Sequence, residues 1–243
     1  MESIYTQSFT LTDLHVDCHR KLKPSALLYF VQEISGIHAA QLGAAWEDLS
    51  KKNLFWAIIR HRVEITRMPE SGETITLETW PMPTTRVAYP RATVAYDAQG
   101  NLLFKTVAIW VLMDHTTRAM VLPGKSGVGV PGILRDTECS LPVSIPVKKS
   151  ENQTSRTVGY SELDRNGHMN NTFYMNWADD LLGSAFHSAH ELRSFNICYL
   201  SEAKEGQTVD LSWEISVENV LSVEGETTDQ AAHRVFAVSA EYT

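Results

Sequence analysis

The feature that most constrains the fold is an order of elements that occurs once in each half of the chain. In both halves, apolar residues recur at helical spacing over one segment, 25–43 and 171–186, and strand-like alternation follows. The turns between the next strands also match, with Gly72 aligned on Gly206. Because an antiparallel sheet buries its apolar face well against a helix, we predict an α+β fold. It would contain two tandem units, each a long helix wrapped by a curved antiparallel β-sheet, as after a duplication.

Between these halves, the sequence predicts a linker. Residues 122–152 hold four of the 13 glycines and four of the nine prolines, which is typical of a segment that crosses the surface. The stretch GVGVPG at 127–132 matches a dinucleotide-binding pattern, but no amphipathic helix follows it, so we do not assign it that role. The predicted domains are an N-terminal unit over 1–122, a linker over 123–155 and a C-terminal unit over 156–243. Strands are predicted at 62–66, 73–80, 91–96, 102–113, 195–202, 208–217 and 233–242.

Composition excludes several classes of protein. No apolar run reaches the roughly 18 residues of a membrane helix, and the N-terminus lacks the basic-then-apolar pattern of a secretory signal. Cys18, Cys139 and Cys198 form no C-x-x-C pair, which favours a reducing compartment, and we predict the cytoplasm. A net charge of -8 argues against nucleic acid as a partner, and we predict no membrane partner. No metal and no cofactor are predicted.

The segment Ser161–Trp177, SELDRNGHMNNTFYMNW, is the strongest candidate for chemistry. Asp164, Asn166 and His168 stand directly before an apolar helical pattern. Asp and Asn cap helices routinely, at about 1 kcal/mol each, so a simple helix start is the alternative interpretation. Unpaired N–H groups at a helix start also stabilise an oxyanion, and a histidine shuttles protons near neutral pH. Both interpretations can hold for the same segment.

This segment, with YLSEA at 199–203, resembles the active-site region of the acyl-acyl-carrier-protein thioesterases of plant plastids and bacteria. Similarity extends through KLKPSALLYFVQEISGIHAAQLG, KKNLFWAIIRHRVEITRMPESGETITLETWP and AIWVLMDHTTRAMVLP. The resemblance implies a tandem hot-dog fold and an enzyme that hydrolyses fatty acyl-acyl carrier protein to free fatty acid and acyl carrier protein. The catalytic residues that it implies are Asp164, Asn166, His168 and Glu202.

The resemblance also implies different roles for the two units. Catalytic groups belong to the second hot-dog, whereas the first lines the acyl-chain pocket as a non-catalytic copy. Many plant members carry a cysteine after the glutamate, but this chain has Ala203, so we expect attack by water without a cysteine nucleophile. Whether His168 or Glu202 takes the proton stays open. Aligning HVDCH on the motif places His19 on His168. That alignment puts His15 and Asp17 in place of Asp164 and Asn166.

The implied partner is an acyl carrier protein that carries a phosphopantetheine-linked acyl chain. A basic run supports an acidic partner, although a solvated face explains such a run equally well; it contains Lys51, Lys52, Arg60, Arg62 and Arg67. The alternatives are an acyl-coenzyme A thioesterase, a hot-dog dehydratase and a non-catalytic acyl-thioester-binding protein. We expect a monomer or a homodimer, and the chain-length preference stays open.

Overall fold

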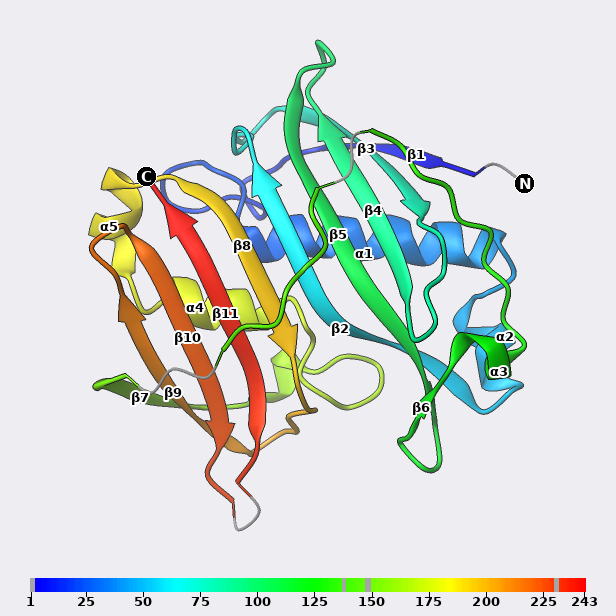
Figure 1. Cartoon of the computed structure of the whole chain (residues 1–243). Coiled ribbons are helices and arrows are strands. Elements are labelled where there is room, and N and C mark those ends of the chain that lie inside the picture. The colour runs from blue at the N-terminus through cyan, green and yellow to red at the C-terminus, as the bar shows by residue number, and fades with distance from the viewer. Residues whose placement is uncertain (1–2, 137–138, 147–149, 230–231) are drawn as a thin grey trace. The chain divides into compact units, whose positions relative to one another are not determined.

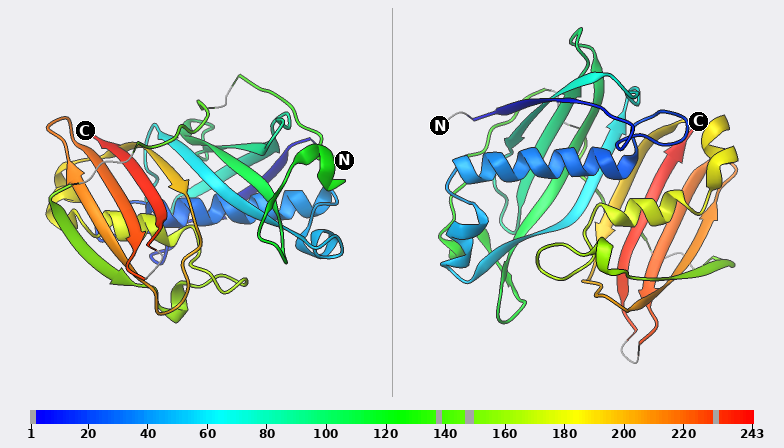
Figure 2. Two further views of the ribbon diagram at one scale, coloured as in Figure 1. Left: turned by 60° about the horizontal axis from the view of Figure 1, so that its bottom comes forward. Right: turned by 180° about the vertical axis from the view of Figure 1, so that it is seen from behind.

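The computed structural model describes residues 3–136, 139–146, 150–229 and 232–243 of the chain. The chain divides into two compact units, Met1–Pro142 and Val143–Thr243. In each unit, a helix lies across one face of an antiparallel sheet, as Figures 1 and 2 show. The predicted α+β class with two tandem hot-dog units is confirmed.

The N-terminal unit contains a sheet in the order β1-β3-β4-β5-β2, with β6 paired to β5. Its elements are β1 (Tyr5–Thr10), α1 (Pro24–Gln41), α2 (Trp46–Ser50), β2 (Leu54–Ile65), β3 (Thr74–Pro81), β4 (Tyr89–Tyr96), β5 (Leu102–Asp114), β6 (Met120–Val121) and α3 (Pro123–Ser126). Helix α1 begins at Pro24, because proline suits the first helical position, where its missing N–H is not needed. Leu27, Ile34 and His38 are fully buried on the face that meets the sheet. The long first helix is therefore confirmed.

The other face of this sheet is covered by part of the predicted linker. Ile133 and Cys139 pack against Trp80 and its apolar neighbours on β4 and β5. The N–H of Ile133 donates to the carbonyl of Pro81 at 2.9 Å. Arg135 lies over the ring of Trp80, 4.6 Å from its centroid. This stretch is thus a packed layer of the N-terminal unit.

The C-terminal unit contains a sheet in the order β8-β11-β10-β9-β7. Its elements are β7 (Asn152–Thr157), the 3-10 helix η1 (Tyr160–Glu162), α4 (Phe173–Asp179), α5 (Gly183–Ala189), β8 (Leu192–Tyr199), β9 (Thr208–Ile215), β10 (Val220–Thr227) and β11 (Arg234–Tyr242). The duplicated turn is visible in the backbone, because Gly72 and Gly206 have φ angles of 89° and 78°. Both are in the left-handed region that favours glycine. The predicted match of these two glycines is confirmed.

The prediction of one helix over 171–186 is wrong, because that segment forms two short helices, α4 and α5. Gly183, the first residue of α5, has a φ of 72°, outside the right-handed helical region, so one continuous helix cannot run through it. Apolar residues keep the four-residue spacing through the break, so periodicity alone does not detect it. Val217, assigned to a strand from its alternation, lies beyond β9 and is 95% exposed. No helix in the described part of the chain is long and apolar enough to cross a membrane.

Candidate active site

The loop that precedes α4 is folded around the carboxylate of Asp164. Its Oδ1 accepts the backbone N–H groups of Asn166 at 2.8 Å and of His168 at 3.2 Å. The N–H of Gly167 donates to the carbonyl of Asp164 at 3.0 Å, and Gly167 has a φ of 77°. Asp164 therefore holds His168 in place through its backbone. Asn166 is exposed, and its Nδ2 donates to Asp164 Oδ2 at 3.2 Å.

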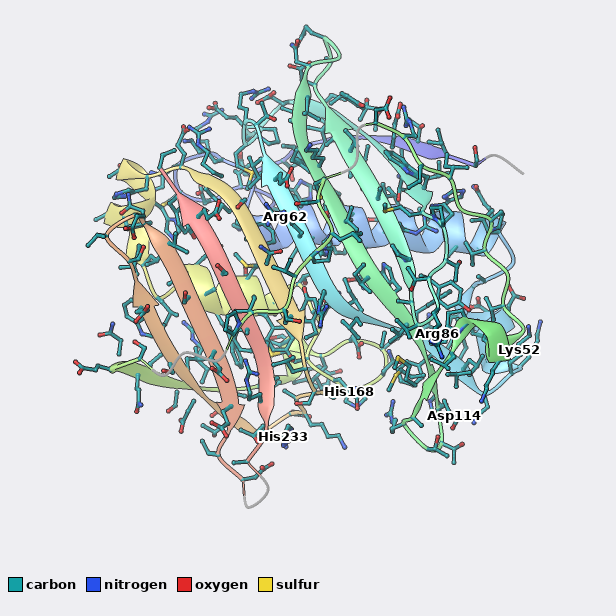
Figure 3. The ribbon with its side chains drawn as sticks, viewed as in Figure 1. Lys52, Arg62, Arg86, Asp114, His168 and His233 are labelled. Carbon is teal, nitrogen blue, oxygen red and sulfur yellow. The ribbon has the colours of Figure 1, made fainter. Side chains whose placement is uncertain are left out.

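His168 and Glu202 form a direct contact between side chains from distant parts of the sequence. His168 Nε2 lies 3.1 Å from Glu202 Oε2. The side chain of His168 is only 10% exposed, whereas that of Glu202 is 42% exposed. Backbone contacts fix the two segments together, since the N–H of Met169 donates to the carbonyl of Ala203 at 2.8 Å. The structure thus brings together the predicted His and Glu, and Figure 3 marks the position of His168.

A second carboxylate, which the sequence analysis missed, anchors this loop to α4. Glu162 Oε1 accepts a hydrogen bond from Trp177 Nε1 at 2.8 Å, and its Oε2 accepts the N–H of Gly159 at 2.8 Å. The carbonyl of Glu162 accepts the N–H of Asn170 at 2.8 Å. Trp177 is 1% exposed, so its indole N–H needs a partner inside the protein. The signal in the sequence was a glutamate just ahead of the motif and a tryptophan in the following helix.

One backbone donor in this region has no acceptor. Asn170 Oδ1 accepts the N–H of Thr172 at 3.0 Å, and the carbonyl of Asn170 accepts the N–H of Phe173 at 3.0 Å. Within the described residues 168–173, Asn171 is the residue whose N–H makes no hydrogen bond. The segment after Asn166 was predicted to supply such donors at the helix start. Asn171 lies in that segment, just before α4.

The N-terminal unit contains the same loop in a changed form. Asp17 Oδ1 accepts the backbone N–H groups two and four positions later, at 2.8 and 3.0 Å, as Asp164 does. This correspondence places Lys21 where the C-terminal unit has His168. The sequence alignment of His19 on His168 is therefore wrong by two residues. Both strings contain an aspartate and a histidine, and only the hydrogen-bond register reveals the true match.

Two further substitutions follow from this register. The carbonyl of Pro69 accepts a backbone N–H from the loop of the first copy at 2.8 Å, just as the carbonyl of Ala203 accepts one from the loop of the second copy. Met68, which precedes Pro69, therefore stands in the place of Glu202, which precedes Ala203. The residue just before Pro24 and the residue just before Asn171 donate equivalent backbone hydrogen bonds, at 3.0 and 2.8 Å. Pro24 therefore stands in the place of Asn171. Proline has no N–H to donate. The first copy consequently lacks the His–Glu pair and the unpaired amide together.

Aromatic packing borders the site on the side of α4. The Tyr174 ring lies 4.7 Å from that of Phe236 and 5.8 Å from that of Tyr199, measured between centroids. Burial raises the pKa of Tyr174, and the negative charges of Asp164 and Glu202 add to the rise. The phenol is therefore protonated at neutral pH.

The predicted basic run does not form one uniform patch. Lys52 precedes β2, whereas Arg62 lies towards the end of that strand, and Figure 3 labels both. Arg62 Nε lies 2.9 Å from Glu64 Oε1, and Lys52 Nζ donates to the carbonyl of Gly127 at 2.6 Å. Further along, Arg67 forms a bidentate ion pair with a neighbouring carboxylate, with 2.7 Å for each bond. Carboxylates and carbonyls thus already hold much of the charge that we assigned to docking.

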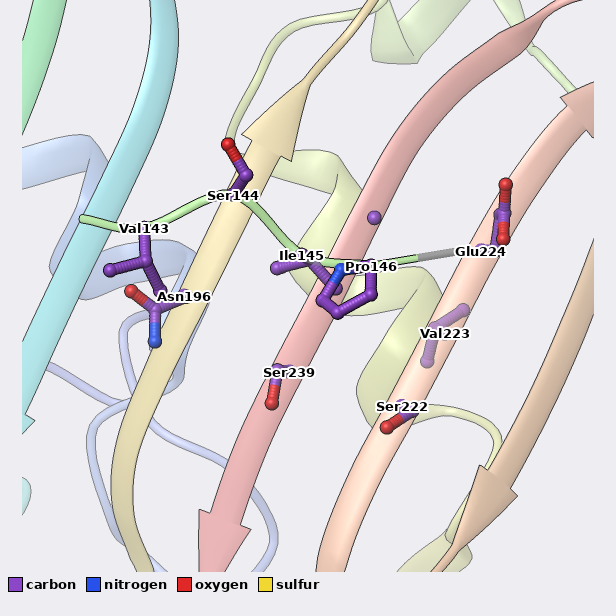
Figure 4. A pocket seen from close by; sticks show the side chains of 10 residues that line it. Val143, Ser144, Ile145, Pro146, Asn196, Ser222, Val223, Glu224 and Ser239 are labelled. Carbon is purple, nitrogen blue, oxygen red and sulfur yellow. The ribbon is translucent and has the colours of Figure 1, made fainter. Parts of the chain in front are cut away.

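A pocket of about 260 Å³ lies on the face of the C-terminal sheet opposite α4, as Figure 4 shows. The extended segment 143–146 covers it, and Asn196, Ser222 and Ser239 form its polar floor. None of the predicted catalytic residues lines this pocket.

Comparison with known proteins identifies the family of the chain. Residues 2–122 match the acyl-ACP thioesterase N-terminal domain, and residues 146–241 match the acyl-ACP thioesterase C-terminal domain. The chain therefore belongs to the acyl-ACP thioesterase family.

Among solved structures, an acyl-ACP thioesterase from Bacteroides thetaiotaomicron superposes with a TM-score of 0.88 and 24% identity. The match covers 99% of this chain and 98% of that one. The 12:0-ACP thioesterase from Umbellularia californica has a TM-score of 0.83 and 21% identity, covering 100% and 98%. These likenesses establish the fold.

Curated relatives are longer proteins. The chloroplastic palmitoyl-acyl carrier protein thioesterase of Gossypium hirsutum is 23% identical over 214 residues, which is 82% of this chain and 52% of that protein. The chloroplastic oleoyl-acyl carrier protein thioesterase 1 of Arabidopsis thaliana is 23% identical over 230 residues, 85% and 62% respectively. The chain thus spans between half and two thirds of the length of these relatives.

Proposed function

We propose that the chain hydrolyses the thioester of fatty acyl-acyl carrier protein by attack of water. The observation that carries this proposal is the contact of 3.1 Å between His168 Nε2 and Glu202 Oε2. Water adds to the thioester carbonyl carbon, the C–S bond breaks, and the thiol leaves with a proton. The products are a free fatty acid and the carrier protein with its phosphopantetheine thiol.

His168 is proposed as the base that takes the proton from water. A neutral imidazole accepts a proton near neutral pH, and an adjacent carboxylate stabilises the imidazolium that forms. Glu202 supplies that carboxylate. His168 then returns the proton to the leaving thiolate.

The N–H of Asn171 is proposed to stabilise the negative charge that develops on the carbonyl oxygen. A preorganised backbone donor at such a place contributes strongly, because it needs no reorganisation during the reaction. Asp164 is a positioning residue that holds the loop, and Asn166, exposed beside it, is proposed to orient the carbonyl or the water. The replacement of Asn171 by Pro24 in the first copy supports the proposal that the N-terminal unit is non-catalytic. That unit, predicted over 1–122, is proposed to hold the acyl chain.

The cysteines support attack by water over a thiol nucleophile. Ala203 follows the glutamate and is fully buried. Cys198 is 3% exposed, and its Sγ lies 3.5 Å from the carbonyl of Val143. Burial raises the pKa of Cys139 to about 12, so this thiol stays protonated at neutral pH.

Acyl carrier protein is proposed as the partner, since the named relatives are acyl carrier protein thioesterases. Acyl-coenzyme A remains the alternative donor. The cytoplasmic location and the state as a monomer or a homodimer stay predictions.

The test compares hydrolysis of one acyl chain on acyl carrier protein and on coenzyme A by the purified protein. We expect higher kcat/KM with the carrier protein and a loss of about 10²-fold or more in His168→Ala. Glu202→Gln, which keeps the shape of the side chain, should lose turnover without losing stability. Normal rates in folded His168→Ala would contradict the proposal, and a preference for coenzyme A would favour the alternative donor.

A further inference from the structure

The N-terminal unit buries a strip of polar side chains between α1 and its sheet. The strip crosses four strands and includes one residue of α1. Its members are Thr79 on β3, Arg91 and Thr93 on β4, Thr106 on β5, His61 on β2 and His38 on α1, and none exceeds 7% exposure. Register places these strand residues on one face, because Thr79 pairs with Thr93, and Arg91 pairs with Ala108. So many polar groups are uncommon in the interior of such a small unit.

Arg91 is the unusual member, because its hydrogen-bond partners among the described residues are a histidine and a threonine and include no carboxylate. Arg91 Nη1 lies 3.1 Å from His38 Nδ1 and 3.4 Å from Thr79 Oγ1. Within the described residues, no carboxylate pairs with Arg91, and its Nε and Nη2 have no acceptor. Burial lowers the pKa of Arg91 to about 10, so the group is still a cation at neutral pH. Burial of a cation without a counter-charge is strongly unfavourable.

A buried donor without an acceptor lies on the same face of the sheet. Trp110 Nε1 is enclosed and forms no hydrogen bond within the described part of the chain. On β5, Trp110 is two residues beyond Ala108, and Ala108 pairs with Arg91, so the two long side chains are diagonal neighbours. Long side chains in this relation are within reach of one another.

The residue opposite Arg91 on β5 is small. Ala108 lies in the row between Arg91 and His61 and contributes only a methyl group. Buried polar groups in proteins are almost always hydrogen-bonded, so the unpaired Trp110 Nε1 beside the Arg91 cation, which has no counter-charge, indicates a missing acceptor. Both groups only donate, so the acceptor must be an oxygen or another lone-pair atom.

We propose that Arg91 and Trp110 recognise an oxygen function on the acyl chain: a hydroxyl, an oxo group or a carboxylate. This inference rests on the proposed function, in which the N-terminal unit holds the acyl chain. An unsubstituted chain would leave both donors unpaired and would place methylene groups against a desolvated cation. A site built to bind an oxygen rejects the analogue that lacks it much more strongly than an apolar pocket rejects an added group.

The experiment measures kcat/KM with acyl carrier protein loaded with decanoyl, 3-hydroxydecanoyl, ω-hydroxydecanoyl and sebacoyl chains. We expect at least one oxygenated chain to exceed decanoyl by about tenfold or more, as expected for hydrogen bonds to a charged group. Arg91→Met and Trp110→Phe should each reduce that ratio towards one. Thr93→Val is the matched control, because Thr93 belongs to the strip but donates to Thr79. It should keep the ratio.

Equal rates for all four chains in the wild-type protein would overturn the inference, as would an unchanged ratio in both donor variants. Trp110→Phe keeps the aromatic shape, so it serves as the test if Arg91→Met does not fold. Calorimetric binding of decanoic and ω-hydroxydecanoic acid separates this inference from the proposed function. If no thioester is hydrolysed, the proposed function fails, but tighter binding of the hydroxy acid that is lost in Trp110→Phe still supports the site. If thioesters are hydrolysed and neither assay shows a preference, the inference alone fails.

Discussion

Replacing Asn171 by proline removes one hydrogen-bond donor from the proposed site, the backbone N–H that would face the oxyanion. The fold should accept the change, because Pro24 stands at the equivalent position of the N-terminal unit and begins α1 there. No hydrogen bond to another residue is lost, since the N–H of Asn171 has no acceptor among the described residues. The side chain is also lost, so Asn171→Ala, which keeps the N–H, is the control.

Loss of one oxyanion donor costs roughly 10²- to 10³-fold in kcat. We therefore expect Asn171→Pro to lose about that factor in turnover of acyl carrier protein substrate, with a melting temperature close to that of Asn171→Ala. The assay is single-turnover hydrolysis with excess enzyme, so that binding and product release do not mask chemistry. If Asn171→Pro is folded and as active as Asn171→Ala, the amide does not stabilise the transition state.

Other predictions concern the loop, the buried histidine and the thiols. Trp177→Phe should cost about 1–3 kcal/mol of stability, because Glu162 Oε1 loses its donor, and it should lower turnover. Trp46→Phe, at an exposed position, should change neither stability nor turnover. Burial lowers the pKa of His61 from 6.5 to about 3, so the folded state excludes a proton that the unfolded state binds. That stabilisation is complete above pH 6.5 and is lost as the pH falls towards 3. In urea unfolding, His61→Gln should remove a few kcal/mol of the change in the free energy of unfolding with pH. An undiminished dependence would contradict this role of His61. Alkylation of the cysteines should leave turnover intact in protein that stays folded, and inactivation of folded protein would favour a thiol mechanism.

The sequence was sufficient for the features that local physics controls. Apolar residues at helical spacing, alternation along strands and glycine at turns all act within a few residues, and α1, β3, β9 and the pair Gly72/Gly206 were predicted from them. Strands with weaker alternation were missed, among them β10, whose VLSVEGET mixes apolar and charged residues.

The site was only partly predictable, because it depends on contacts between segments. The motif indicated His168 and Glu202, but only the structure shows their contact. The unpaired amide of Asn171 is a property of hydrogen-bond register, to which a sequence gives no access. The same register corrected the alignment of the two copies by two residues. The ion pairs of the basic run also depend on such contacts, since the carboxylates that bind it come from other positions, such as Glu73.

The most direct test of attack by water follows oxygen-18 from labelled water during a single turnover with excess enzyme. The mechanism predicts one labelled oxygen in the released fatty acid and none in the protein, because His168 activates a water that attacks the thioester carbonyl. Label found in the carboxylate of Glu202, with unlabelled fatty acid, would show an acyl-enzyme on that residue and would contradict the mechanism.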